Sequence, residues 1–185
     1  MQTKKSFLTS KYHQDKDMVG CTRHRLTLSS HPGKAIVHDR DREKVHEGHP
    51  VYWFRLGEAD QAVNIEISTG FEDGQLIRIE GADQGFLCKD YKFKVGEEVI
   101  TWKHIKRGHK FFCVNANGTI SPTHAHNRVW GLNDKDELCL VEEDSEKKLV
   151  FENLPAAYTN RKIMKLAPSN FVMAGKALVV RDLVN

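Results

Sequence analysis

The chain has 185 residues and a formal net charge of +3, and 39% of its residues are hydrophobic while 29% are charged. These values are typical of a single globular domain, and the small net charge argues against a DNA-binding protein. Apolar runs stay shorter than the roughly 18 residues of a transmembrane helix, and the lysine-containing N-terminus lacks the apolar stretch of a secretory signal.

In chain order, residues 1–19 are polar and are expected to form a flexible N-terminal segment. From residue 20 on, β-branched and aromatic residues gather in short apolar runs with turn-forming residues between them. These runs are LTL (26–28), AIV (35–37), VYWF (51–54), NIEI (64–67), LIRI (76–79), VITW (99–102), FFCV (111–114), LCLV (138–141) and LVFE (149–152). The pattern predicts an all-β protein with little helix, and closed arrangements are favoured because they leave few exposed strand edges.

Part of this pattern repeats three times. The runs that end at Trp53, Trp102 and Val141 are each followed by an apolar residue ten positions later. The three residues reached in this way are Val63, Phe112 and Phe151. Turn sequences containing Asp-Gly and Asn-Gly follow the first two units. A repeated strand, loop, strand and turn predicts three similar lobes, with these three apolar residues buried near a common axis.

The repeat resembles that of the ricin-type (R-type) β-trefoil lectins, in which each unit carries a Q-x-W segment followed by a turn such as D-G-T-I. Here DQAV (60–63), HKFF (109–112) and KLVF (148–151) occupy the Q-x-W places, and NGTIS (117–121) is the nearest literal match. The resemblance rests on spacing and apolar character. It implies a single β-trefoil of three degenerate, QxW-like repeats over residues 20–154. An unrelated barrel or sandwich is the alternative.

The C-terminal segment 155–185 continues beyond the third unit and is expected to be an extension that docks on the trefoil. Its stretch 174–182 echoes residues 32–39 near the start of the first unit. The start of a further repeat is therefore the second interpretation of this segment.

The resemblance also implies a carbohydrate site in the first unit, at Asp39, Trp53, Asp60 and Gln61. In such a site Trp53 stacks on the apolar face of a pyranose, Asp39 accepts hydrogen bonds from two hydroxyls, and Asp60 or Gln61 fixes a third. Galactose and N-acetylgalactosamine are the ligands that the resemblance implies. The alternative for Trp53 is a buried core residue that caps the barrel.

The same resemblance gives expectations for the second and third units. A possible second site comprises Asp90, Trp102 and His109, although Asp90 is out of register with the family's acidic residue. The third unit has Val141 in the aromatic place and Lys148 in the amide place, and it is not expected to bind sugar.

Histidine pairs with ligand-like spacing occur at 46 and 49 and at 124 and 126, and Cys21 precedes His24 by three positions. Because no second matched pair completes a zinc signature, we expect neither a metal nor a cofactor. The four cysteines are far apart and form no CxxC pair, which favours reduced thiols and a cytoplasmic protein, with unconventional secretion or cell-surface association as the alternative.

The run at 103–110 carries a cluster of lysine, arginine and histidine side chains without interleaved aromatic residues. It is interpreted as a solvated loop, with polyanion binding as the alternative. Asn117-Gly-Thr119 matches a glycosylation acceptor but also suits a tight hairpin turn, which the repeat requires there. No nucleophile elbow, phosphate loop or metalloprotease helix is present in the sequence, so an enzyme is not expected.

The sequence therefore predicts a carbohydrate-binding, lectin-like protein whose partners are glycans or glycoproteins, with homo-oligomerisation as one route to avidity. The alternative is a non-catalytic scaffold that has lost sugar binding and holds protein partners through its loops.

Overall fold

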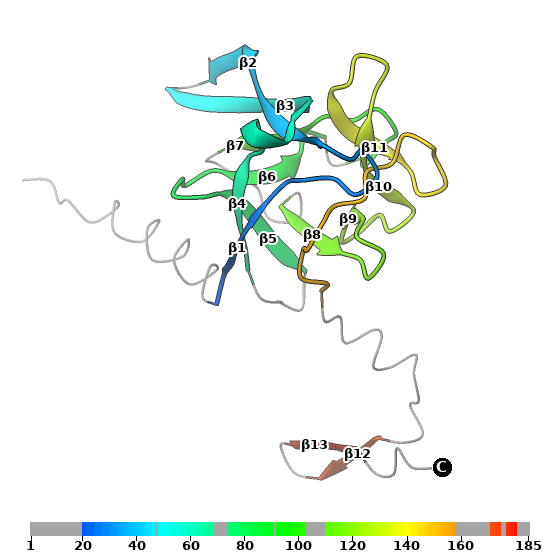
Figure 1. The fold of residues 1–185 in the computed structure, drawn as a ribbon. Helices are drawn as coiled ribbons and strands as arrows, with labels where there is room; N and C mark the ends of the chain where they lie inside the picture. The colour runs from blue at the N-terminus through cyan, green and yellow to red at the C-terminus, as the bar shows by residue number, and fades with distance from the viewer. Residues whose placement is uncertain are drawn as a thin grey trace, which may run out of the picture.

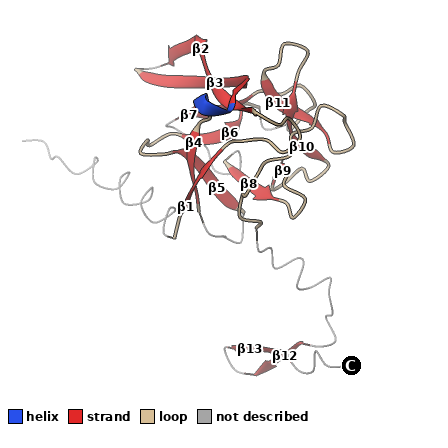
Figure 2. Cartoon of the chain, in the orientation of Figure 1, coloured by secondary structure: helices blue, strands red, loops and turns tan. Residues whose placement is uncertain are grey.

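The computed structural model describes residues 20–46, 48–68, 74–90, 92–102 and 110–157, together with the backbone of strands at 171–174 and 177–180. Within these residues the regular structure is strand, apart from the short 3₁₀ helix η1 (Ala59–Gln61), as Figure 2 shows. The all-β prediction is therefore confirmed. In the same part of the chain, no helix has the length and apolar character needed to span a membrane.

The strands pair in antiparallel fashion (Figure 1). In chain order they are β1 (Thr22–Arg25), β2 (Lys34–His46), β3 (His49–Glu58), β4 (Asn64–Ile67), β5 (Gln75–Ile79), β6 (Gly85–Cys88), β7 (Val99–Trp102), β8 (Phe111–Val114), β9 (Ile120–Pro122), β10 (Arg128–Leu132), β11 (Leu138–Glu142), β12 (Phe171–Ala174) and β13 (Ala177–Val180). Seven of them, β2 to β5, β7, β8 and β11, contain apolar runs named above, whereas the runs at 26–28 and 149–152 lie outside the strands. One sheet has the order β1-β4-β5-β6-β7-β3-β2, with β8 attached to β5 and β9 to β8. The pairs β10–β11 and β12–β13 form separate ribbons.

Successive pairings run through the middle of the fold. β1 pairs with β4, β4 with β5, β5 with β8 and β8 with β9. The segment around Phe151 then continues the series, because its backbone N–H donates to Gly118 O at 2.9 Å and Phe151 also forms a bridge with Leu28. Paired strands thus lead from β1 to β9, and a backbone hydrogen bond and an isolated bridge at Phe151 lead on to Leu28, but the strand pairings among the described residues form no closed barrel.

The three hairpins β2–β3, β6–β7 and β10–β11 meet one another through their second strands. Tyr52 lies opposite Thr101, which joins β3 to β7. Isolated bridges join Arg55 on β3 to Glu137 and join Glu98 to Cys139 on β11. Each hairpin therefore contacts both of the others.

The core is built around Trp130 on β10, whose side chain is 0% exposed. Its ring centroid lies 5.2 Å from that of Phe86, 5.1 Å from that of Phe112 and 5.9 Å from that of Phe151. Phe54 extends the group through Phe86, at 4.8 Å. The sequence repeat, which aligns Trp53 with Trp102, leaves out this central tryptophan.

Val63, Phe112 and Phe151, the three apolar residues expected near a common axis, all contact the same core, but they are buried to different degrees. Phe112 and Phe151 are buried, whereas Val63 is partly buried and packs against the outside of the cluster. The prediction for Val63 is wrong in this respect. Val63 lies between η1 and β4 and lines a pocket, while Ile65 and Ile67 on β4 supply the fully buried side chains.

The Asn-Gly-Thr sequence at 117–119 forms the turn between β8 and β9. Gly118 has φ of 81° and its N–H donates to Asn115 O at 2.9 Å, so the turn needs the left-handed conformation that glycine adopts at little cost. Asn117 Oδ1 accepts hydrogen bonds from the backbone N–H and the hydroxyl of Thr119, which is only 1% exposed. The acceptor sequence is therefore engaged in the turn itself.

The C-terminal strands β12 and β13 pair with each other, from Phe171 opposite Val180 to Ala174 opposite Ala177. Whether the segment 155–185 docks or begins a further repeat lies outside the described residues. The expected flexibility of residues 1–19 and the character of the basic run at 103–109 lie outside them as well.

Candidate functional site

Asp39 and Trp53 face each other across the β2–β3 hairpin, but neither side chain is open to solvent. Their exposed fractions are 6% and 9%. Trp53 packs in a cluster with neighbours that include Leu87 and Ile100, and the guanidinium carbon of Arg42 lies 5.3 Å from the centre of its ring. The stacking platform that the sequence analysis placed at Trp53 is thus buried under other side chains.

The other two residues of the expected site lie on η1, which follows β3. Asp60 and Gln61 are both exposed. The backbone carbonyl of Asp60 accepts a hydrogen bond from Arg25 Nη2 at 3.0 Å, which fixes η1 against the end of β1. Of the four predicted residues, only Gln61 lines the pocket described next.

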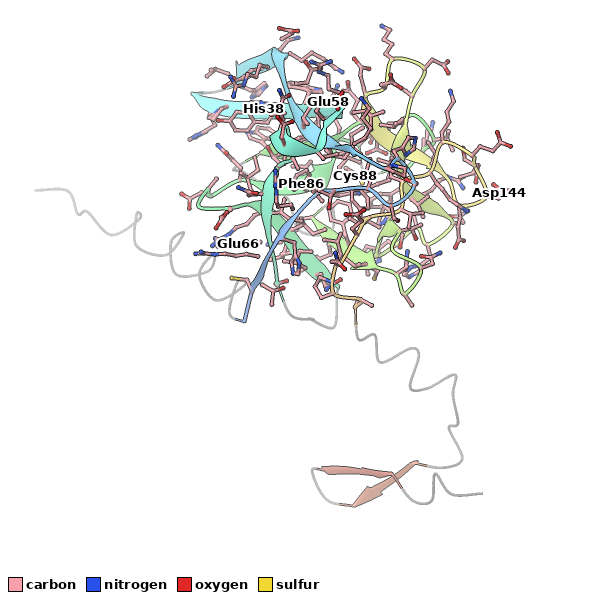
Figure 3. The ribbon with its side chains drawn as sticks, in the orientation of Figure 1. His38, Glu58, Glu66, Phe86, Cys88 and Asp144 are labelled. Carbon is pink, nitrogen blue, oxygen red and sulfur yellow. The ribbon has the colours of Figure 1, made fainter. Side chains whose placement is uncertain are left out.

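A pocket of about 540 Å³ lies on the opposite face of the β2–β3 hairpin, and we call it the β2–β4 pocket. Its lining combines an apolar floor with an aromatic side chain and several amides and carboxylates. The lining residues are His38, Glu43, Tyr52, Phe54, Gln61, Val63, Asn64, Ile79, Glu80, Ala82 and Gln84. Figure 3 shows His38 beside the upper hairpin, on the side of the molecule away from Asp144.

The alternation of side chains along a strand explains why this pocket was missed. Successive residues of β2 and β3 point to opposite faces, so His38 and Tyr52 lie on one face and Asp39 and Trp53 on the other. A shift of one position in the assigned register moves every side chain to the wrong face. The sequence signal for the pocket was Tyr52, directly before the tryptophan of the expected site.

His38 packs against the aromatic side chain of Tyr52 in the pocket. Its ring meets that of Tyr52 edge-on, with centroids 4.6 Å apart, and its Nε2 is buried without a hydrogen-bond partner among the described residues. Burial lowers the pKa of His38 below 6.5, and nearby Arg40 adds to this, while Glu43 and Asp39 act in the opposite direction. The imidazole is therefore mainly neutral at neutral pH.

The charge of the pocket is acidic. Its two carboxylates come from Glu43 and Glu80, and neither lysine nor arginine is among its lining residues. Glu80 lies 3.2 Å from Arg23 Nε and is thereby partly neutralised. Glu43 is exposed and forms no ion pair with the described residues. One carboxylate at the rim thus remains available to a ligand.

The second candidate site is not assembled in the described part of the structure. Asp90 is exposed, and its backbone N–H donates to the Glu97 carboxylate. Trp102 is partly buried against the cluster that contains Trp53, and its ring meets that of His46 edge-on at 5.3 Å. His109 lies outside the described residues.

In the third unit, Val141 is buried with Val129 and Cys139, and Lys148 Nζ donates to the backbone carbonyl of Glu143 at 3.1 Å. Neither residue offers an aromatic face or an amide to a sugar.

Arg42 holds the three hairpins together. Its guanidinium bonds to Glu98 before β7, lies 2.9 Å from Glu137 before β11, and covers Trp53 on β3. Glu98 also accepts a hydrogen bond from Lys89 Nζ at 2.8 Å. We call the set Arg42, Lys89, Glu98 and Glu137 the Arg42 network.

Burial of Glu98 on its own would raise the pKa of that carboxyl. The hydrogen bonds from Lys89 and Arg42, with a weaker contribution from the Trp53 indole and the charge of Arg42, outweigh burial and lower the pKa of Glu98 to about 2. The Trp53 N–H does not reach the geometry of a good hydrogen bond, so we attribute the effect mainly to the two basic side chains. The network serves the structure rather than a ligand.

No three metal-ligating side chains cluster within the described residues. His24 Nε2, one of the candidates, lies 2.7 Å from Thr22 Oγ1. Burial raises the pKa of Cys139 to about 11 and that of Cys88 well above its ordinary value, so neither thiol is activated as a nucleophile.

Comparison with models of known protein families, with curated proteins and with solved structures gives no match to this chain.

Proposed function

We propose that this chain is a carbohydrate-binding, lectin-like module and that the β2–β4 pocket is its main site. The observation that carries the proposal is the composition of the pocket: the half-buried ring of Tyr52 lies beside the exposed amides of Gln61 and Asn64 and the exposed carboxylate of Glu43. A pyranose has an apolar C–H face that stacks on an aromatic ring and hydroxyls that pair with amides and carboxylates.

The pocket also has an apolar floor. It is open at the rim and closed below by Phe54 and Ile79, which belong to the core or pack against it. Galactose and N-acetylgalactosamine are the first ligands to test, since the sequence resemblance implies them.

The proposal includes the β-trefoil fold, which two features support. The first is the series of pairings from β1 back to the residues after β1, through the bridge between Leu28 and Phe151. The second is the set of contacts among the hairpins, considered with Trp53, Glu98 and Glu137 as equivalent positions. A threefold rotation then maps the bridge Glu98–Cys139 onto Arg55–Glu137. The same rotation maps the pair Tyr52–Thr101 onto the backbone hydrogen bonds from Leu140 N to Glu97 O and from Leu56 N to Asp136 O. On this alignment Trp53 and Trp102 are not equivalent, unlike in the sequence alignment.

One observation favours the second candidate function, a non-catalytic scaffold that has lost sugar binding. Asp39 and Trp53, which the family pattern would place in a sugar site, are buried, and Arg42 and Lys44 lie over the Trp53 ring. A scaffold would bind its protein partner in the same way whether or not free sugar is present.

Replacement of Tyr52 by alanine should weaken sugar binding at least tenfold, because the stacking face is lost, whereas Tyr52→Phe should retain most of the affinity. A shallow pocket of this kind is expected to bind a monosaccharide with a Kd on the order of millimolar, about 4 kcal/mol. Titration with galactose and N-acetylgalactosamine, followed by chemical shifts in NMR spectra, measures this range directly.

Gln61→Ala should also weaken binding, while Asn127→Ala, which removes an exposed amide just before β10 and outside the pocket lining, should leave it unchanged. Thermal unfolding of each variant separates loss of binding from loss of fold. If a glycan array and the titration both find no sugar that binds, or if Tyr52→Ala binds as well as the natural chain, the proposed function is wrong.

A further inference from the structure

The acidic rim of the β2–β4 pocket indicates which sugars it selects. We infer that the site prefers sugars with a free amino group over neutral sugars and disfavours acidic ones, with Glu43 as the counter-ion of the sugar ammonium. This inference rests on the proposed function, since it concerns the ligand of the same pocket.

The first step of the argument is that Glu43 is placed to meet a ligand. β2 carries Arg42, Glu43 and Lys44 in succession. Arg42 and Lys44 lie over the Trp53 ring, on the far face of the hairpin, whereas Glu43 lines the pocket. The two basic side chains that flank Glu43 in sequence are thus directed away from it by the alternation of the strand.

The second step is that no positive charge in the lining offsets Glu43. Arg23 is associated with Glu80 and, at 3.7 Å, with Glu66. His38 is mainly neutral at neutral pH, because burial lowers its pKa. Arg40 acts on His38 electrostatically but does not line the pocket. The charge that a ligand meets is therefore negative.

The third step concerns the size of the preference for the amino sugar. Glu43 is exposed, so its attraction for an ammonium is screened by water and is worth no more than an ordinary surface ion pair. An interaction of this strength corresponds to a preference of about two- to fivefold in Kd. It should shrink as salt is added, because exposed charges are screened over roughly 10 Å at 0.1 M ionic strength.

The experiment compares three methyl glycosides that share one ring: the galactosaminide with a free amine, the neutral galactoside and the galacturonide. Each is titrated into the full chain at a pH where the amine is protonated, at low and at high salt. The expected order of affinity is amine, then neutral, then acid, with the three values converging at high salt.

Glu43→Gln should remove the preference for the amine, so that the ratio of the two Kd values, for the amine and for the neutral galactoside, falls to about one. The matched control is Asp144→Asn, which removes the same charge from an exposed residue on the other side of the molecule and should keep the preference (Figure 3). Equal binding of the amine and the neutral sugar, or a preference that persists in Glu43→Gln, would overturn the inference but not the proposed function. Absence of binding to all three sugars overturns both.

Discussion

Replacement of Trp130 by alanine should destabilise the protein by about 3–5 kcal/mol, the range found when a large aromatic side chain is removed from a packed core. Trp130 is 0% exposed, and its ring contacts Phe86, Phe112 and Phe151, which come from separate parts of the chain. The cavity left by alanine would therefore loosen several strands at once. The free energy of unfolding, measured with urea, tests this expectation.

Two further variants test whether the loss of stability in Trp130→Ala comes from the central position of this side chain. Trp130→Phe retains an aromatic ring and loses an indole N–H that has no hydrogen-bond partner among the described residues, so it should cost much less than alanine. Trp102→Ala removes the same side chain from a partly buried position on the outer face of the hairpins, and it should cost less than half as much. If Trp102→Ala proves the more destabilising of the two alanine variants, the position of Trp130 at the centre of the core is wrong.

Sequence reasoning located β2 to β5, β7, β8 and β11 because apolar runs are a local signal, whereas β1, β6, β9 and β10 were not among the predicted runs. Short apolar runs bounded by turn residues predict Val99–Trp102 and Leu138–Glu142, and both are strands. β5 shows the limit of the same reasoning. The Asp-Gly turn sequence that follows the first unit, taken over 73–77, overlaps the predicted run at 76–79. In the structure the strand begins at Gln75, and Gln75 and Leu76 pair with β8.

The candidate site was predicted less well, because the face of a strand depends on a register that only tertiary packing fixes. The prediction of Trp53 rested on the internal repeat, in which it ends the first apolar run, and on the place of the aromatic residue in the lectin pattern. In the fold, Trp53 belongs to the face covered by Arg42, and Tyr52 belongs to the face that opens into the pocket. Gln61 lines the pocket because η1, which follows β3, lies against β2.

The alignment of the internal repeat differs from the spatial one for a related reason. Spacing between aromatic residues aligns Trp53 with Trp102, although contacts among the hairpins relate Trp53 to Glu98 and Glu137. Glutamates would not be recognised as partners of a tryptophan from sequence alone. Their common feature is spatial: all three surround the guanidinium of Arg42.

Replacement of Arg42 by alanine should lower the free energy of unfolding by about 1–3 kcal/mol at neutral pH, a value between those of surface and buried ion pairs. The side chain of Arg42 is 32% exposed, and those of Glu98 and Glu137 are 21% and 20% exposed. Removal of the guanidinium leaves two partly buried carboxylates that repel each other and uncovers the Trp53 ring. Urea unfolding of both proteins at neutral pH gives the difference.

The pH dependence of the free energy of unfolding tests whether the contact between Arg42 and Glu98 causes this loss of stability. In the natural chain the pKa of Glu98 is about 2 in the folded state, below its ordinary value of 4.5, so the folded state binds fewer protons than the unfolded one between these values. The stabilisation from Glu98 is therefore complete above pH 4.5 and is lost as the pH falls toward 2. In Arg42→Ala the pKa of Glu98 should rise toward its ordinary value. The free energy of unfolding of this variant should therefore decrease less between pH 4.5 and pH 2 than that of the natural chain.

Lys147→Ala is the matched control, because it breaks an ion pair with Asp134, whose side chain is 93% exposed. This variant should unfold at nearly the same urea concentration as the natural chain, since solvent screens the pair. A double variant, Arg42→Ala with Glu98→Gln, should recover part of the lost stability, because it removes the repulsion between Glu98 and Glu137. If Arg42→Ala instead unfolds like the Lys147 variant and retains the full acid sensitivity of the natural chain, the Arg42 network does not hold the hairpins together.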